Sequence, residues 1–251
     1  MYEIPTDTMS EAFFPVWRSA AVHLNRQLDG GSRAWLRAHP YPPFLEHLSF
    51  RLGNQLFFVR VEDADGVVQG PGPEQGHVTA AGQAEGLACC LPMRRMAGAD
   101  QWSPVHPGWG LLDAHTGEPM DPMGCVTDEL IPMTAWELQD VAVQVVRDRL
   151  EQQGRQLMSW QGNPEVDPSI WFVGESQQPE WVVVRVVTFP NTQAVRPGNW
   201  EQIARNCAAL GATGHFASVS LASSQQAQAT DGVVAPLWRG HALTLLYRGL
   251  E

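Results

Sequence analysis

The chain of 251 residues contains no lysine, since all 16 of its Lys and Arg residues are arginine. This absence excludes a Schiff-base lysine, the lysine of a phosphate-binding loop and a lysine general base. The Gly-x-Gly-x-x-Gly dinucleotide motif and the Gly-x-Ser-x-Gly motif of many hydrolases are absent too. The sequence therefore lacks the signatures of several common enzyme classes.

Cysteine is scarce, and its spacing matches neither a metal site nor a disulfide framework. There are four cysteines, and two of them, Cys89 and Cys90, are adjacent. No apolar run approaches the ~18 residues that span a bilayer, and the N-terminus lacks the features of a signal peptide. We therefore expect a cytoplasmic protein with ordinary thiols, no cofactor and no membrane association.

Positive charge is in the minority, and the formal net charge is −11. Proteins that bind nucleic acids usually carry a basic face, whereas the arginines of this chain are scattered along the sequence. An acidic chain better suits a basic partner protein. The charge therefore favours a protein partner over nucleic acid.

Hydrophobic periodicity predicts three helices, over residues 15–28, 134–154 and 199–211. The second helix begins with Thr134, followed three residues later by Glu137, which is the pattern of a capping box. Its buried stripe is expected to comprise Leu138, Val141, Ala142, Val145, Val146 and Leu150. The inward face of the third helix is expected to comprise Trp200, Ile203, Ala204, Cys207 and Leu210.

Apolar runs between these helices predict strands. Residues 47–63 are expected to form a hairpin that turns at Gly53-Asn54, and residues 169–189 a second hairpin. Residues 88–96 are a weaker candidate, because Pro92 allows at best an edge strand there. Further strands are expected at 155–160, 215–223 and 241–249.

The two halves of the sequence show the same order of elements at an offset of 125 residues. The Val-Arg-Val run at 59–61 recurs at 184–186. We therefore predict an α/β (α+β) fold with two tandem pseudo-repeated units, each formed by a helix, a β-hairpin, a helix and strands in two layers. The predicted units span residues 1–120 and 134–251, and residues 121–133 link them.

Arg60 and Arg185 each interrupt an apolar strand, at equivalent positions of the two units. Strand alternation places both side chains on the same side relative to their units. Each arginine could pair with a carboxylate, such as Glu62 or Glu180, on a less covered sheet face. Alternatively, the two guanidinium groups could line a shared cleft and bind an anionic ligand or the carboxylates of a partner.

The second half contains a helix, three strands, a helix and a strand in this order. This order resembles the core of the restriction-endonuclease-like nucleases. The resemblance implies an Asp at the second strand and an acidic–x–Lys motif on the third, which together hold a divalent metal. Asp167 lies at the first position, but the third strand offers Val183-Val184-Arg185, with Glu180 only at its start. Because Mg²⁺ needs oxygen ligands, the resemblance implies a degenerate catalytic motif.

Two histidines, His215 and His241, each follow a glycine and open a late strand. If those strands are neighbours, the two side chains could approach each other. Asp167 or Glu180 could then complete a metal or acid–base site. The alternative is that both are strand-end histidines bonded to backbone or water.

Three of the ten tryptophans, Trp102, Trp109 and Trp238, lie near predicted loops or strand edges, close to Pro or Gly. Exposed Trp together with Arg is typical of protein interfaces. The alternative is that large side chains fill the cores of two small units.

The sequence thus favours a non-catalytic acidic protein that binds another protein, as inhibitors, immunity proteins and chaperones do, and its charge suits a basic partner. The predicted binding residues are Arg60, Arg185, Trp102, Trp109 and Trp238. One alternative is a metal-dependent hydrolase or nuclease relative that uses Asp167, Glu180, His215 or His241. The other is a sensor of a small anionic ligand that uses the two arginines.

Overall fold

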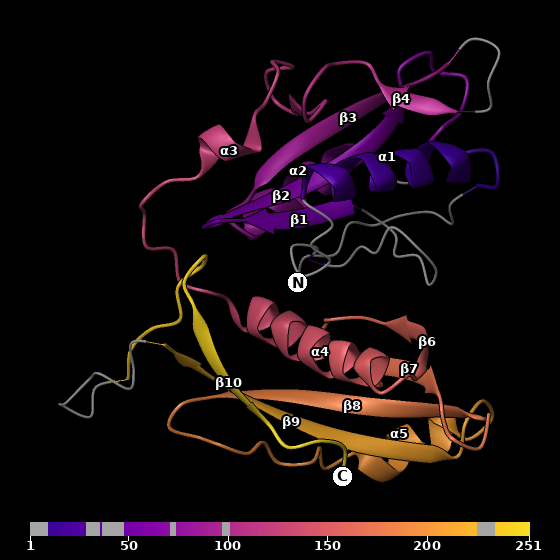
Figure 1. Ribbon diagram of the computed structural model, residues 1–251, viewed down its shortest axis with the longest axis vertical. Coiled ribbons are helices and arrows are strands. Elements are labelled where there is room, and N and C mark those ends of the chain that lie inside the picture. Colours follow the sequence, from indigo (N-terminus) through magenta and orange to yellow (C-terminus); the bar gives the residue numbers. More distant parts are fainter. Residues whose placement is uncertain (1–9, 29–35, 37–47, 71–73, 97–100, 225–233) are drawn as a thin grey trace. The chain divides into compact units, whose positions relative to one another are not determined.

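The computed structural model describes residues 10–28, 36, 48–70, 74–96, 101–224 and 234–251. The chain divides into two compact units, Met1–Glu129 and Leu130–Glu251, with the boundary inside the segment 121–133. Each unit combines helices with one mixed β-sheet (Figure 1). The predicted mixed α/β class is therefore confirmed.

The sheet of the first unit has the strand order β1-β2-β3-β4, with β5 also paired to β3. Its strands are β1 (Leu48–Leu52), β2 (Gln55–Asp63), β3 (Leu87–Arg95), β4 (Trp102–Pro104) and β5 (Leu112–Asp113). Its helices are α1 (Phe14–Gln27), α2 (Glu74–Gln83) and α3 (Pro122–Cys125). β2 and β3 are parallel, and the other pairs are antiparallel. The hairpin turn at Gly53-Asn54 is confirmed, since Leu52 pairs with Gln55.

The prediction of an edge strand around Pro92 is wrong. Pro92 belongs to β3, which lies between β2 on one side and β4 and β5 on the other. β5 pairs with Cys89 and Cys90, and β4 pairs with residues 93–95. Pro92 falls between these two short partners, where its missing N–H interrupts neither ladder. A central strand can therefore tolerate this proline.

The second unit has the strand order β10-β9-β8-β7-β6. Its strands are β6 (Gln156–Trp160), β7 (Ile170–Val173), β8 (Pro179–Thr188), β9 (Thr213–Ser223) and β10 (Leu243–Tyr247). Its helices are α4 (Ala135–Gln152) and α5 (Trp200–Cys207). β8 and β9 are parallel, and the other neighbours are antiparallel.

Each sheet has a helix on both faces, so the prediction of two layers is wrong in this detail. In the second unit, Val182 and Val184 of β8 pack in the core with α4, whereas Trp181 and Val183 pack with α5. Figure 1 shows α4 and α5 on opposite faces of this sheet. In the first unit, α1 packs against Val59 and its neighbours. α2 lies on the opposite face, where His77 Nε2 is 2.9 Å from the carbonyl oxygen of Phe58. Alternate residues of one strand therefore face two different helices.

The two units share one topology, in agreement with the predicted tandem repeat. Each has a helix, an antiparallel strand pair, a second helix and a strand parallel to the second of the pair. An offset of 125 moves β2 onto residues 180–188, and β8 spans Pro179–Thr188. The same offset moves α2 onto residues 199–208, and α5 spans Trp200–Cys207. The second unit adds β6 at one edge.

The capping box of α4 is confirmed, because Thr134 accepts from the Glu137 backbone and Glu137 accepts from that of Thr134. The buried face of this helix is rotated relative to the prediction, since Trp136 and Val143 are buried whereas Leu138, Val141 and Val145 are only partly covered. In α5 the expected core residue Leu210 lies beyond the helix end and is 70% exposed. Within the part of the chain that the structure describes, no helix is long and apolar enough to cross a membrane.

Candidate functional site

Both arginines of the repeated Val-Arg-Val run have carboxylate partners. Arg60 Nε lies 2.9 Å from Glu62 Oε1, as one of the two interpretations predicts. Arg185 pairs with Asp167 instead of Glu180, through two hydrogen bonds of 2.8 and 2.5 Å. An anionic ligand at either arginine would have to displace a carboxylate that is already in place.

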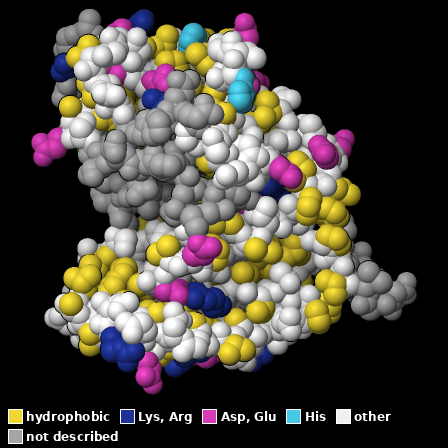
Figure 2. All heavy atoms as spheres, turned by 180° about the vertical axis from the view of Figure 1, so that it is seen from behind, with side chains coloured by type: hydrophobic (Ala, Val, Ile, Leu, Met, Phe, Trp, Pro, Cys, Tyr) yellow, Lys and Arg dark blue, Asp and Glu magenta, His cyan; other side chains and the backbone are white. Residues whose placement is uncertain are grey.

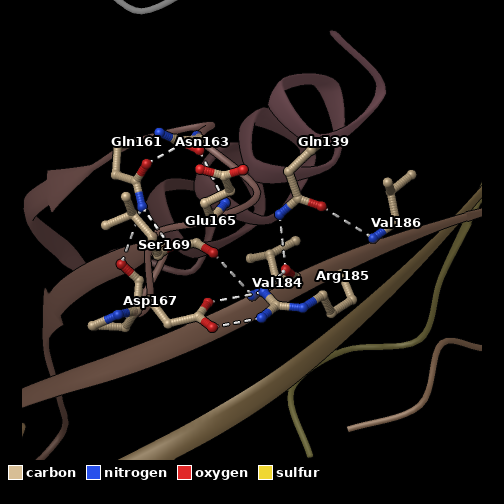
Figure 3. A network of polar contacts seen from close by, with 11 residues as sticks. Gln139, Gln161, Asn163, Glu165, Asp167, Ser169, Val184, Arg185 and Val186 are labelled. Carbon is tan, nitrogen blue, oxygen red and sulfur yellow. Dashed lines mark hydrogen bonds and ion pairs between the residues drawn. The ribbon is translucent and has the colours of Figure 1, made fainter. Parts of the chain in front are cut away.

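The pair of Arg185 and Asp167 belongs to a network that completes the edge of β8 (Figure 3). β7 begins at Ile170, opposite Val182, so the residues of β8 after Val182 need other partners on this side. The side-chain amide of Gln139 donates to the Val184 oxygen at 2.8 Å and accepts from the Val186 nitrogen at 3.2 Å. Arg185 also donates to the Val184 oxygen at 2.9 Å. This arrangement serves the structure of the sheet.

The loop before β7 carries the other half of this network. Gln161 accepts from the Asn163 backbone and donates to the Val166 oxygen, while Asn163 accepts from the Glu165 backbone (Figure 3). These contacts hold the loop that presents Asp167 to Arg185. The charge of Asp167 adds to burial in raising the pKa of the Cys207 thiol, and burial is the larger cause.

The four candidate catalytic residues do not form one site. Glu180 Oε2 lies 2.7 Å from His215 Nε2, so these two are brought together. Because side chains alternate along β8, this pair lies on the α4 face and Arg185, with Asp167, on the α5 face. The expected approach of His215 and His241 is wrong. β9 and β10 are antiparallel, with Ala242 bonded to Ser224, so the two histidines stand about 30 Å apart along β9.

The described residues contain no group of three or more His, Cys, Asp or Glu side chains placed to hold a metal ion. Among the predicted binding tryptophans, Trp102 and Trp109 are partly buried and pack against the core of the first unit. Trp109 stacks on Phe50, with ring centroids 5.5 Å apart. Trp238 is also partly buried and forms an isolated β-bridge with Pro132. Trp102 and Trp109 therefore pack against the core of the first unit, and the binding role of the three tryptophans stays a prediction.

A pocket of about 230 Å³ lies in the second unit, at the carboxyl ends of the parallel strands β8 and β9. In sheets with parallel strands this edge is where ligands commonly bind. Its lining is almost wholly apolar and includes Met133, Leu138, Phe189, Leu221, Val234 and Leu237. Phe189 and Val234 are 39% and 48% exposed, so apolar side chains reach solvent at its rim. On the face of the second unit seen in Figure 2, hydrophobic side chains reach the surface between Arg and acidic side chains.

One wall of the pocket is held by contacts between segments about 100 residues apart. The Met133 nitrogen donates to the Leu237 oxygen at 2.8 Å, and the Arg239 nitrogen donates to the Ile131 oxygen at 2.9 Å. The Arg239 side chain then binds the Glu137 carboxylate, with Nη2 at 2.9 Å from Oε2. The pocket is thus built on a fixed frame. The pocket has no signature in the sequence, because its lining comes from four distant segments with no common local pattern.

The side chains that line the pocket are chemically almost uniform. Among its lining residues, only Thr188 has a polar side chain. The pocket can exclude water from an apolar group, and apart from the Thr188 hydroxyl its lining side chains offer no acid, base or nucleophile.

Residues 136–251 match the model of a family described as a domain of unknown function (DUF8840). This range contains nearly all of the second unit, including the pocket from Leu138 onward. No curated protein matches the chain, and no solved structure does so either.

Proposed function

We propose that the chain is a non-catalytic protein-binding protein whose second unit takes one apolar side chain of its partner into the pocket beside α4. The observation that carries this proposal is the pocket itself, which has an apolar lining, an exposed apolar rim and a volume of about 230 Å³. Pockets for drug-sized ligands usually measure about 300–1,000 Å³. A smaller apolar pocket suits the anchoring side chain of a protein partner.

The charge of the chain supports a basic partner. Residues 1–129 carry 16 acidic residues and eight arginines, and residues 130–251 carry 11 acidic residues and eight arginines. The net charge is therefore −8 in the first unit and −3 in the second. An acidic protein attracts a basic partner over a distance and accelerates the encounter, while an apolar anchor supplies affinity. Inhibitors, immunity proteins and chaperones that mask a basic protein need this combination.

The internal pairing of ionisable residues supports the non-catalytic part of the proposal. Asp167 is bound to Arg185, and Glu180 is bound to His215. The two pairs lie on opposite faces of the sheet, so their four side chains do not converge on one reaction centre.

The test is capture of a partner from a lysate of the organism that makes the protein, with two matched variants. Val234→Trp places a large ring at the rim of the pocket, where the side chain is 48% exposed. Val195→Trp makes the same change at a position of the second unit that is 86% exposed and outside the pocket lining. We expect wild type and Val195→Trp to retain a stoichiometric basic partner that Val234→Trp loses. Equal retention by all three proteins would contradict the role of the pocket.

A further inference from the structure

The outer edge of β10 differs from the other sheet edges of this protein. Exposed edges usually carry a device that prevents pairing with a second chain, such as a charge, a proline, a bulge or a covering segment. β1 has Arg51 and a hydrogen bond from the Leu36 nitrogen to the Ser49 oxygen. β4 is three residues long and ends in Pro104. β6 has a register shift between Leu157 and Ser159.

Among the residues that the structure describes, β10 has none of these devices. Its five residues, Leu-Thr-Leu-Leu-Tyr, include no charge and no proline, and their pairing with β9 is regular. Leu245 and Leu246 are 50% and 40% exposed, so apolar side chains project on both faces of this edge. Within the described residues no strand pairs with its outer side, because the sheet order ends at β10. Such an edge is a template for another strand.

The backbone direction of β10 follows from its hydrogen bonds to β9. The Ser224 nitrogen donates to the Ala242 oxygen at 3.1 Å. In an antiparallel ladder, alternate residues bond to the same neighbour, so Thr244 and Leu246 also face β9. Leu243, Leu245 and Tyr247 therefore direct their N–H and C=O groups outward.

We infer that β10 pairs antiparallel with β10 of a second copy of this chain, around a twofold axis at Leu245. The outward set is symmetric about this residue, so Leu245 meets Leu245 of the second copy and Leu243 meets Tyr247. In each of these pairs, the outward N–H of one residue donates to the outward C=O of the residue opposite, and the reverse bond forms as well. A twofold interface requires this kind of self-complementarity, in which the same patch serves both copies.

The charges flanking β10 permit this pairing. Extending the register by one residue sets Arg248 opposite Ala242, and the next position sets His241 opposite Gly249. Within the paired segments, residues 241–249, no charged side chain meets a like charge in this register. One strand pair buries little area compared with a standard interface, so we expect a weak dimer that forms only as the concentration rises. The inference is independent of the pocket and of its proposed partner.

The test is the mass in solution, measured by sedimentation velocity over a concentration series of the full chain. We expect wild type to shift from one to two times 27.7 kDa as concentration rises. Leu245→Pro removes only an outward N–H and should abolish the shift without loss of the fold. Leu245→Glu and Leu245→Lys should each stay monomeric, because a like charge then faces itself across the axis.

The decisive arm is a mixture of the Leu245→Glu and Leu245→Lys proteins, in which opposite charges meet and the dimer should return. Leu246→Glu is the matched control. Its side chain is also exposed but faces Thr244 in this register, so we expect it to retain the dimer. A monomer at every concentration, a dimer that persists in Leu245→Pro, or no recovery in the mixture would each overturn the inference.

Discussion

Glu137 and Arg239 form a two-point ion pair that is buried almost completely, with side-chain exposures of 0% and 1%. Glu137 also accepts from the Thr134 nitrogen at 3.0 Å and so caps α4. One carboxylate therefore joins the start of the helix to a segment 102 residues later. This link fixes the wall of the apolar pocket.

Loss of Arg239 is expected to destabilise the protein strongly. Arg239→Ala leaves the Glu137 carboxylate buried without its cation, which typically costs about 3–5 kcal/mol. Arg155→Ala is the matched control, because its partner Glu175 is 84% exposed and such pairs contribute about 0–1 kcal/mol. Urea denaturation of the two variants measures the difference in the free energy of unfolding. A loss in Arg239→Ala no larger than in Arg155→Ala would refute the structural role of this pair.

Gln139 is expected to stabilise β8, because its side chain bonds the backbone of β8 as a neighbouring strand would. Its amide makes two hydrogen bonds to the backbone of β8. Gln139→Ala removes both and should cost about 1–3 kcal/mol, because the strand groups lose their partners. Gln202→Ala makes the same change at an exposed position of α5 and should lie within about 0.5 kcal/mol of wild type. Hydrogen exchange at Val186 should rise only in the first variant.

The stability of the first unit is expected to fall in mild acid. Burial lowers the pKa of His23 below its ordinary 6.5, and nearby Arg26 acts in the same direction, while the hydrogen bond to the Trp109 oxygen opposes the shift. The folded state therefore favours neutral His23. The stabilisation that His23 contributes is complete above about pH 6.5. It is lost as the pH falls through the lower pKa that His23 has in the folded state.

Thermal unfolding at several pH values between about 5 and 7.5 measures this effect. His23→Gln keeps a side-chain N–H for the Trp109 oxygen but cannot become protonated, so its melting temperature should fall less than that of wild type. His115→Gln replaces an exposed histidine and should follow wild type. Identical pH profiles for all three proteins would show that His23 is not the titrating group.

The elements that depend on local sequence could be predicted. The capping box of α4 and the turn at Gly53-Asn54 are encoded within four residues each, and both are confirmed. The offset of 125 residues between the halves also predicted equivalent elements, since β2 and β8 occupy matching positions. Local pattern and repeat order are sufficient for these features because neither depends on long-range contacts.

The remaining features depend on contacts between distant segments. Hydrophobic periodicity does not show that α1 and α2 cover opposite faces of one sheet. The sequence therefore predicts two layers in each unit, where the structure has three. The histidine pair was wrong because strand direction decides whether His215 and His241 meet, and apolar alternation does not show direction. Pro92 looked unsuitable for a central strand only because the gap between β4 and β5 is invisible in the sequence.

The central claim is that the pocket beside α4 receives an apolar side chain of a protein partner. The most direct measurement is photo-crosslinking from a benzoylphenylalanine placed at Val234, with the same residue at Val195 as the control, followed by identification of the linked peptides. The account predicts one dominant partner protein, linked from position 234 at or beside an apolar residue and not from position 195. Equal labelling from both positions, or no protein adduct at position 234, would contradict it.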